Sequence, residues 1–182
     1  MRSRAAVVAV AAAAGIASAA SPAGTVKNAR ALALRTADFQ MPAQRVSENE
    51  NRAAHLPGGT GQAYQATFKL HAGERVELVG TIVITAPSVD VARRAFVKVS
   101  SDAKATAAAP LTLPRLGDQQ YAALFGRPAV DEASALVWVR TGTVVWQIQT
   151  SSVSKPFGYS RREALLEVTK YARKQQLRAS AG

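Results

Sequence analysis

The sequence predicts an α+β protein in which an antiparallel sheet of four or more strands packs against two main helices. Three observations favour this class: a hairpin at 135–149 that holds both tryptophans, a second hairpin at 64–84, and two helical patterns that begin after Ser88 and after Ser160. Alternating apolar residues indicate strands, whereas apolar residues three and four positions apart indicate helices. Each element has an apolar row on at least one face, so we expect them to share a core.

The hairpin at 135–149 reads ALVWVRTGTVVWQIQ, with two runs of β-branched, aliphatic and tryptophan residues around Thr141-Gly142. A short pair that contains glycine between two such runs predicts a tight turn. Successive side chains point to opposite faces of a strand. Trp138 and Trp146 therefore each belong to an apolar row of their own strand.

The second hairpin joins a half-buried strand at 64–70 to a longer apolar strand at 76–84 through a turn at 71–74. Val79 and Val83 lie on the face opposite the main apolar row of the longer strand. A strand that is apolar on both faces is typical of a position inside the sheet. We therefore expect this strand to be central or covered on both sides.

Both predicted helices carry start signals. Ser88 follows Pro87 and is suited to be the N-cap of the first helix. Ser160 and Glu163 have the spacing of a capping box at the start of the second helix. The positions predicted to face the core are Ala92, Ala95, Phe96 and Val99 in the first helix and Ala164, Leu165, Val168, Tyr171 and Ala172 in the second.

We expect an N-terminal arm and loop at 21–62, followed by a single α+β domain at 63–178. Ser47 to Thr60 is polar and rich in turn formers, which predicts an exposed loop. A stretch that begins near 111 and leads into the tryptophan hairpin is irregular, and a tight turn is expected at 116–118.

The first twenty residues have the pattern of a secretory signal peptide. Two arginines precede an apolar run from Ala5 to Ala17, and small residues follow, which predicts cleavage before Ala20 or before Ser21. The alternative is a retained N-terminal anchor, although this run is shorter than the roughly twenty residues that cross a bilayer. We expect a secreted protein without a transmembrane segment in its mature chain.

The chain is basic and contains no cysteine, with a formal net charge of +11. Disulfides, thiol nucleophiles and cysteine-ligated metals are therefore excluded. The charge favours an anionic cell-surface polymer or lipid as partner, and expected export argues against nucleic acid. A solvated basic surface without a specific partner is the alternative. The candidate basic face, on the last helix, comprises Arg162, Lys170, Arg173 and Lys174. Cations near a helix C-terminus also favourably oppose the helix dipole.

The sequence offers little support for catalysis. His55 and His71 are expected in exposed loops, and their spacing does not match the helical pair of a zinc site. Asp118 is the carboxylate of most interest, with capping of a turn as the alternative role. We expect neither enzymatic activity nor a cofactor or metal. A hydrolase of an unrecognised type is the alternative.

The predicted order is two strands, a helix, an irregular segment, a hairpin and a terminal helix. With the motifs LGD at 116–118 and VRTG at 139–142, this order resembles small exported actinobacterial proteins and lipoproteins of the PsbP-like α/β sandwich type. It is similar to the extracellular sensor domains of some bacterial receptor kinases. The resemblance covers roughly 38–177, and the chain lacks the lipobox cysteine of the lipoproteins. It implies a ligand-binding or interaction domain without catalytic residues.

We therefore expect an exported, non-catalytic binding domain for a small hydrophobic or envelope-derived ligand, or for a protein partner. A basic adaptor for anionic cell-envelope surfaces is the alternative function. A ligand pocket is expected between the sheet and the helices, lined by Tyr121, Phe125, Trp138 and Trp146. The alternative is that these aromatic side chains are core, since aromatic residues in alternating strands usually pack.

Overall fold

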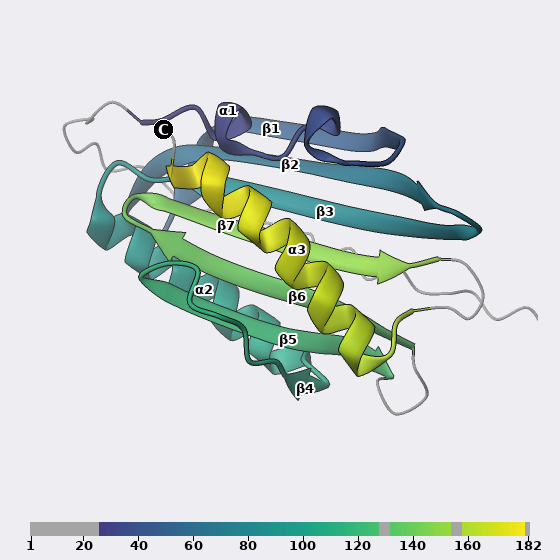
Figure 1. Cartoon of the computed structure of the whole chain (residues 1–182). Helices are drawn as coiled ribbons and strands as arrows, with labels where there is room; N and C mark the ends of the chain where they lie inside the picture. Colours follow the sequence, from purple (N-terminus) through teal and green to yellow (C-terminus); the bar gives the residue numbers. More distant parts are fainter. Residues whose placement is uncertain (1–25, 128–131, 154–157, 181–182) are drawn as a thin grey trace, which may run out of the picture.

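The computed structural model describes residues 26–127, 132–153 and 158–180. The expected signal peptide at 1–20 lies outside these ranges. Seven antiparallel strands form one sheet in the order β1-β2-β3-β7-β6-β5-β4 (Figure 1). The predicted α+β class with an antiparallel sheet is confirmed. The strands are β1 (Ala43–Leu56), β2 (Gly59–Ala72), β3 (Arg75–Thr85), β4 (Ala109–Pro110), β5 (Gln119–Arg127), β6 (Glu132–Thr141) and β7 (Val144–Ser152).

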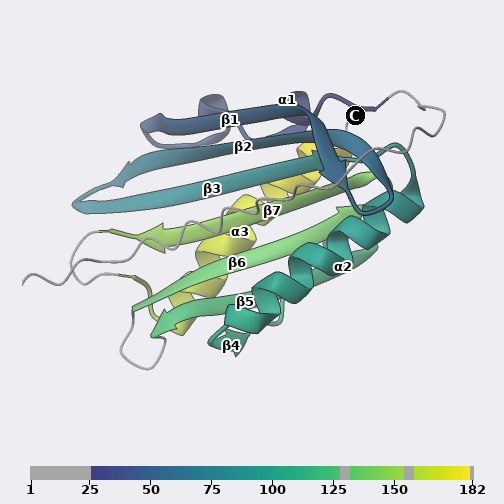
Figure 2. The same cartoon turned by 180° about the vertical axis from the view of Figure 1, so that it is seen from behind.

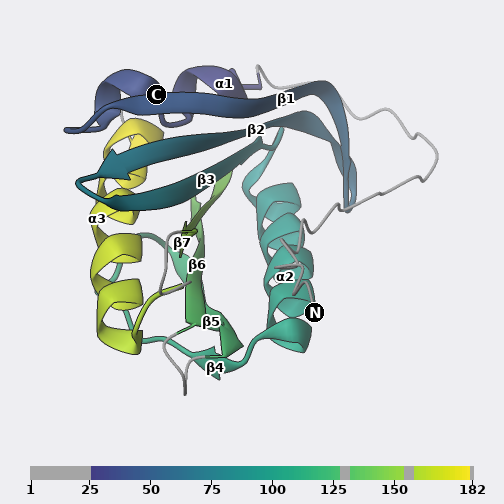
Figure 3. The same ribbon diagram turned by 90° about the vertical axis from the view of Figure 1, so that its right-hand side faces the viewer.

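The described chain has three α-helices and one short 3-10 helix. They are α1 (Ala29–Leu32), α2 (Val89–Thr106), α3 (Arg161–Ser180) and the 3-10 helix η1 (Thr36–Asp38). α3 crosses one face of the sheet and α2 lies against the other, as Figures 2 and 3 show. The two long helices match the predicted pair, and α1 is an additional short helix.

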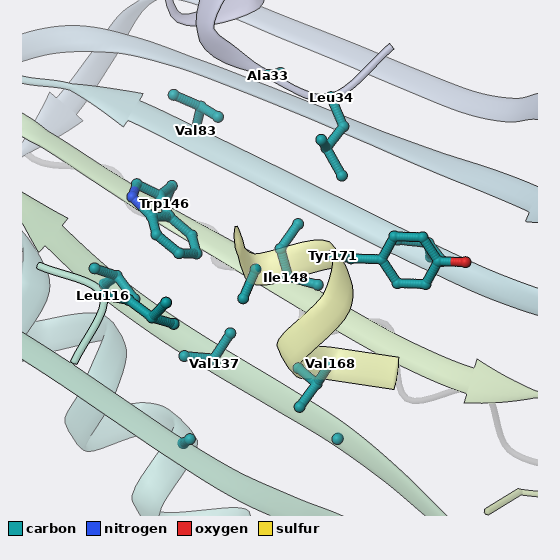
Figure 4. Close-up of a cluster of buried hydrophobic side chains, with 14 of the residues drawn as sticks. Ala33, Leu34, Val83, Leu116, Val137, Trp146, Ile148, Val168 and Tyr171 are labelled. Atoms are coloured by element: carbon teal, nitrogen blue, oxygen red, sulfur yellow. The ribbon is translucent and has the colours of Figure 1, made fainter. Parts of the chain in front are cut away.

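Each face of the sheet has its own core. The larger cluster lies under α3 and includes Trp146, Ile148 and Val137 from the sheet together with Val168 and Tyr171 from the helix (Figure 4). The smaller cluster lies under α2. Its buried members are Ile84, Ala86, Val91, Ala92, Ala95, Phe96, Ala103, Leu136, Trp138 and Val145. The sheet is therefore covered on both faces.

The start signals of both long helices are confirmed. The Ser88 hydroxyl accepts a hydrogen bond of 3.3 Å from the backbone N–H of Val91. At α3 the Ser160 hydroxyl accepts from the Glu163 N–H at 3.3 Å, and the Glu163 carboxylate accepts from the Ser160 N–H at 2.9 Å. These bonds satisfy backbone donors that a helix N-terminus leaves unpaired.

Both predicted hairpins are also confirmed. β2 and β3 are joined at Gly73, and β6 and β7 at Gly142; both glycines have positive φ, at 62° and 56°. β3 lies between β2 and β7, as expected of a strand that is apolar on both faces.

The predicted loop from Ser47 to Thr60 is wrong, because this segment forms most of β1 and the start of β2. The expected arm and loop at 21–62 therefore contain an edge strand, and the sheet begins at Ala43 rather than at 63. β1 pairs with β2 on one side only, and Ala54 is its single buried residue. An edge strand can carry polar side chains along most of its length. The apolar alternation that identifies half-buried strands is consequently missing here.

Candidate functional site

A hollow of about 500 Å³ lies between the N-terminal segment and the inner face of β1 and β2. Its apolar floor is formed by the buried side chains of Leu34, Tyr64 and Phe68. Three arginines also line the hollow. The other lining residues are Asn28, Arg30, Ala31, Arg35, Thr36 and Arg45. The volume falls within the range of about 300–1,000 Å³ that is usual for small-molecule sites.

A β-bulge in β1 places opposite charges on the same face of the hollow. Arg45 pairs with Phe68 and Glu48 pairs with Ala66, so three steps along β1 match two steps along β2. Val46 is the extra residue, and its side chain is exposed. Because side chains alternate along a strand, one extra residue brings Arg45 and Glu48 to the same side of the sheet.

Ion pairs organise the rim of the hollow. Glu48 is shared by Arg30 and Arg45, with N–O distances of 2.9 Å to each. Glu50 lies 3.7 Å from Arg30. The guanidinium of Arg35 makes a different contact, a 3.3 Å hydrogen bond to the backbone oxygen of Ala31. Glu50 is bound more closely by Arg52, at 2.9 Å. Arg30 and Arg45 thus share Glu48, whereas the Arg35 side chain has no carboxylate partner among the described residues.

The Tyr64 phenol is a neutral polar group beside this rim. Burial raises the pKa of Tyr64; hydrogen bonding with Arg45 opposes that increase, and Glu48 adds to it. Tyr64 therefore keeps its proton at neutral pH. The guanidinium carbon of Arg30 lies 6.0 Å from the centre of the Tyr64 ring, at the outer range of a cation–π contact.

Side chains from α3 fix the N-terminal wall of the hollow. The buried Gln175 amide accepts from the Leu34 N–H at 3.2 Å and donates to the Leu32 oxygen at 2.7 Å. Arg178 donates two hydrogen bonds to the Asp38 carboxylate. Burial alone would raise the pKa of Asp38, but the bonds from Arg178 and from the Arg35 backbone outweigh it and lower that pKa. Contacts from α3 therefore hold the wall at Leu32 and Leu34 and the chain just after it at Asp38.

The four residues of the predicted basic face do not form one free surface. Lys170 pairs with Glu167 at 3.2 Å and lies 4.8 Å from the Tyr171 ring centre. Lys174 donates to the Asp38 backbone oxygen at 2.5 Å. Arg162 and Arg173 are exposed. Only two of the four predicted cations therefore point freely into solvent.

The sheet divides the predicted aromatic pocket. Trp146 is fully buried in the cluster under α3, whereas Trp138 belongs to the cluster under α2. Tyr121 and Phe125 pack against the α2 cluster. Val139 is the direct partner of Trp146 in the β6–β7 ladder, so Trp138, one position away, points to the opposite face. The four side chains therefore do not line one site.

Asp118 caps the β6–β7 turn, which lies in a different part of the chain from the turn predicted at 116–118. Its carboxylate accepts from the Gly142 N–H at 2.9 Å and pairs with Arg140 at 2.9 Å. It thereby ties the segment before β5 to the β6–β7 turn. His55 and His71 are exposed, as expected, but they lie in β1 and β2 rather than in loops.

Sequence reasoning missed a buried polar cluster under α3. Glu77 of β3 is 5% exposed, and its direct strand partner is Ser152. Glu77 Oε2 and the hydroxyls of Ser152, Tyr159 and Tyr171 are buried and make no well-aligned hydrogen bond. Glu77 nevertheless interacts with the Tyr159 hydroxyl, and Lys170 with the Tyr171 hydroxyl. Burial, followed by the nearby Glu167, raises the pKa of Glu77. Glu77 occupies an otherwise ordinary strand pattern, so the sequence held no signal for this cluster.

Across the described ranges, no group of three or more histidine, aspartate or glutamate side chains is placed to hold a metal ion. Within the same ranges no helix is both long and apolar enough to cross a membrane. Comparisons of the chain with protein-family models, with curated proteins and with solved structures found no match.

Proposed function

We propose that this protein is a non-catalytic binding protein that holds a small anionic ligand with an apolar part in the arginine-rimmed hollow. The observation that carries the proposal is the placement of Arg30, Arg35 and Arg45 around an apolar floor. A hollow that combines apolar walls with a few convergent polar groups is the usual form of a small-molecule site.

Guanidinium groups suit an anionic ligand for a geometric reason. Their planar N–H donors match the oxygens of a carboxylate or phosphate and bind them in pairs. Arg35 is bound only weakly by the protein, through one 3.3 Å contact. Arg30 and Arg45 already share Glu48, so an incoming anion competes with that carboxylate for their donors. Arg35 is therefore the first arginine available to a ligand.

The apolar floor selects the rest of the ligand. Leu34 and Phe68 contribute carbon surface, and Tyr64 contributes its ring together with a protonated hydroxyl. An aliphatic or aromatic body that covers this floor gains about 25 cal/mol for each Å² of apolar surface removed from water. The expected export of the protein makes an envelope-derived molecule the natural source of such a ligand.

The experiment titrates the protein with 8-anilinonaphthalene-1-sulfonate, which combines an anionic sulfonate with an aromatic body. We expect saturable binding that an Arg35→Gln/Arg45→Gln variant weakens about tenfold, on the order of 0.7 kcal/mol for each lost charged contact. The matched control is Arg93→Gln, which removes an exposed guanidinium from α2 on the other face of the sheet. Equal weakening by the control variant would contradict the proposal.

A further inference from the structure

The outward side of α3 carries a line of residues in which arginine and leucine alternate. The outer stripe consists of Arg162, Leu166, Arg173 and Leu177. Their spacings of four, seven and four residues place all four within an arc of about 60°, at 100° for each residue of an α-helix. The inward residues of α3 face the sheet. Among the described helices and strands, none lies over the outer side of α3 (Figure 1).

The two leucines of the outer stripe are unusually exposed. Leu166 is 59% exposed and Leu177 is 73% exposed, the highest values for large hydrophobic side chains in the described part of the protein. A single exposed leucine needs no explanation. Two on one line of a helix, each four residues after an arginine, form a repeated unit.

The two arginines of the outer stripe are free to bind an anion. Neither Arg162 nor Arg173 has an ion-pair or hydrogen-bond partner among the residues that the structure describes. The acids of α3 are engaged elsewhere, because Glu163 pairs with Arg75 and Glu167 pairs with Lys170. The outer stripe therefore combines unbalanced positive charge with exposed apolar surface.

We propose that the outer stripe docks the protein on the surface of an anionic lipid bilayer. Arginines of an interfacial helix contact anionic head groups, and its apolar side chains enter the boundary between head groups and acyl chains. A soluble polyanion would pair with Arg162 and Arg173 but leave both leucines in water. A neutral apolar partner would bury the leucines but leave the arginines without a counter-charge. An anionic bilayer satisfies both kinds of side chain.

This proposal is independent of ligand binding in the hollow. The outer stripe also differs from the predicted basic face, because it contains two leucines in place of the two lysines. Lys170 and Lys174 are occupied by Glu167 and by the Asp38 backbone, so the surface that reaches a membrane is built from arginine and leucine.

The test is co-sedimentation of the protein, purified from its own culture medium, with vesicles of phosphatidylcholine containing one-third phosphatidylglycerol. One variant carries Arg162→Gln/Arg173→Gln, and a second carries Leu166→Ser/Leu177→Ser. The matched control is Arg93→Gln/Val97→Ser on α2, where an exposed arginine and an exposed valine have the same four-residue spacing. All variants share one N-terminus, so differences between them report on the substituted helix alone.

We expect the wild-type protein to bind these vesicles and to bind vesicles of phosphatidylcholine alone at least tenfold more weakly. The arginine variant lowers the partition coefficient about 25-fold, which corresponds to about fivefold for each cation near the surface. The leucine variant lowers it several-fold, the single Leu177→Ser variant lowers it less, and the α2 control leaves it unchanged. These substitutions should change membrane binding and not folding, because all four side chains lie outside the core.

Three results would overturn the proposal. The first is no binding to anionic vesicles, and the second is equal loss in the α2 control. The third is a pair of observations: the leucine variants bind the vesicles as well as the wild type does, and the protein binds soluble polyglutamate equally well. That pair would show that the arginines bind a soluble polyanion. Circular dichroism spectra that match the wild type show that each variant is folded.

Discussion

Arg178 of α3 donates two hydrogen bonds, of 2.6 and 2.7 Å, to the carboxylate of Asp38 in η1. Both side chains are largely buried, with exposed fractions of 25% and 20%. This paired contact connects the C-terminal helix to the segment that walls the hollow. It is therefore one of the contacts on which the shape of the hollow depends.

Asp38→Asn should destabilise the protein by about 1 kcal/mol at pH 7, because an amide loses the charge that both Arg178 bonds use. The pKa of Asp38 is lowered in the folded protein. The ionised Asp38 carboxylate therefore adds to the free energy of unfolding at pH values above the ordinary aspartate pKa. This stabilisation is lost as the pH falls through the lower pKa of the folded state. Urea unfolding at pH 7 and pH 2.5 measures the difference. The control, Asp90→Asn in an exposed ion pair, should change little. A loss for Asp38→Asn that is as large at pH 2.5 as at pH 7 would contradict this account.

Glu77→Gln should stabilise the protein at pH 8, by on the order of 1 kcal/mol. Burial raises the pKa of Glu77 in the folded state. The folded protein therefore binds the Glu77 proton more tightly than the unfolded chain does. The free energy of unfolding consequently decreases as the pH rises from the ordinary glutamate pKa through the raised pKa of the folded state. The gain from the amide should be much smaller at pH 4, where the side chain is mostly neutral in both the folded and the unfolded state. Thermal unfolding at the two pH values tests this, and an equal gain at pH 4 would exclude ionisation as its cause.

Gly61→Ala should destabilise the β1–β2 hairpin by about 1–3 kcal/mol. A Cβ atom at this position would overlap the backbone oxygen of Thr85 and approach the Leu56 side chain. Gly80 is the matched control, since a Cβ there meets its nearest neighbour at 3.8 Å, an ordinary contact. Chemical unfolding of both variants measures the effect. Equal stability of the two would show that β2 and β3 are not packed as described.

Gln175→Leu should loosen the N-terminal wall of the hollow. The substitution leaves the Leu34 N–H and the Leu32 oxygen without their partner, at a cost of about 1–3 kcal/mol for each buried group. Amide hydrogen exchange should become faster at Leu34, and 8-anilinonaphthalene-1-sulfonate should bind more weakly. Unchanged protection of Leu34 would show that the segment is held by other contacts.

The elements predicted from the sequence are those with a strong local signal. The hairpins around Gly73 and Gly142 and the helices after Ser88 and Ser160 each combine a pattern with a turn or a cap. β1 was missed because its exposed positions are polar and a bulge at Val46 interrupts the alternation. An edge strand is specified by its neighbour, β2, more than by its own residues.

The candidate site depends on non-local contacts, which local patterns do not contain. Alternation correctly described the faces of β6 and β7 separately, but the register between them decides that Trp138 and Trp146 lie on opposite sides of the sheet. The hollow was not predicted, since Arg30, Arg45 and Tyr64 meet only after the N-terminal segment folds back onto β1 and β2. In the sequence, Arg30, Arg35 and Arg45 cannot be distinguished from arginines of an ordinary solvated surface.

The most direct test of the proposed function is native mass spectrometry of the protein purified from its native source. We expect a bound mass of a few hundred daltons that survives desalting, as for a molecule that fits a hollow of about 500 Å³. The bound fraction should be lower in an Arg35→Gln/Arg45→Gln variant and unchanged in Arg93→Gln. A bare protein mass for the wild type, or a bound fraction that the double variant leaves unchanged, would contradict ligand binding in the hollow.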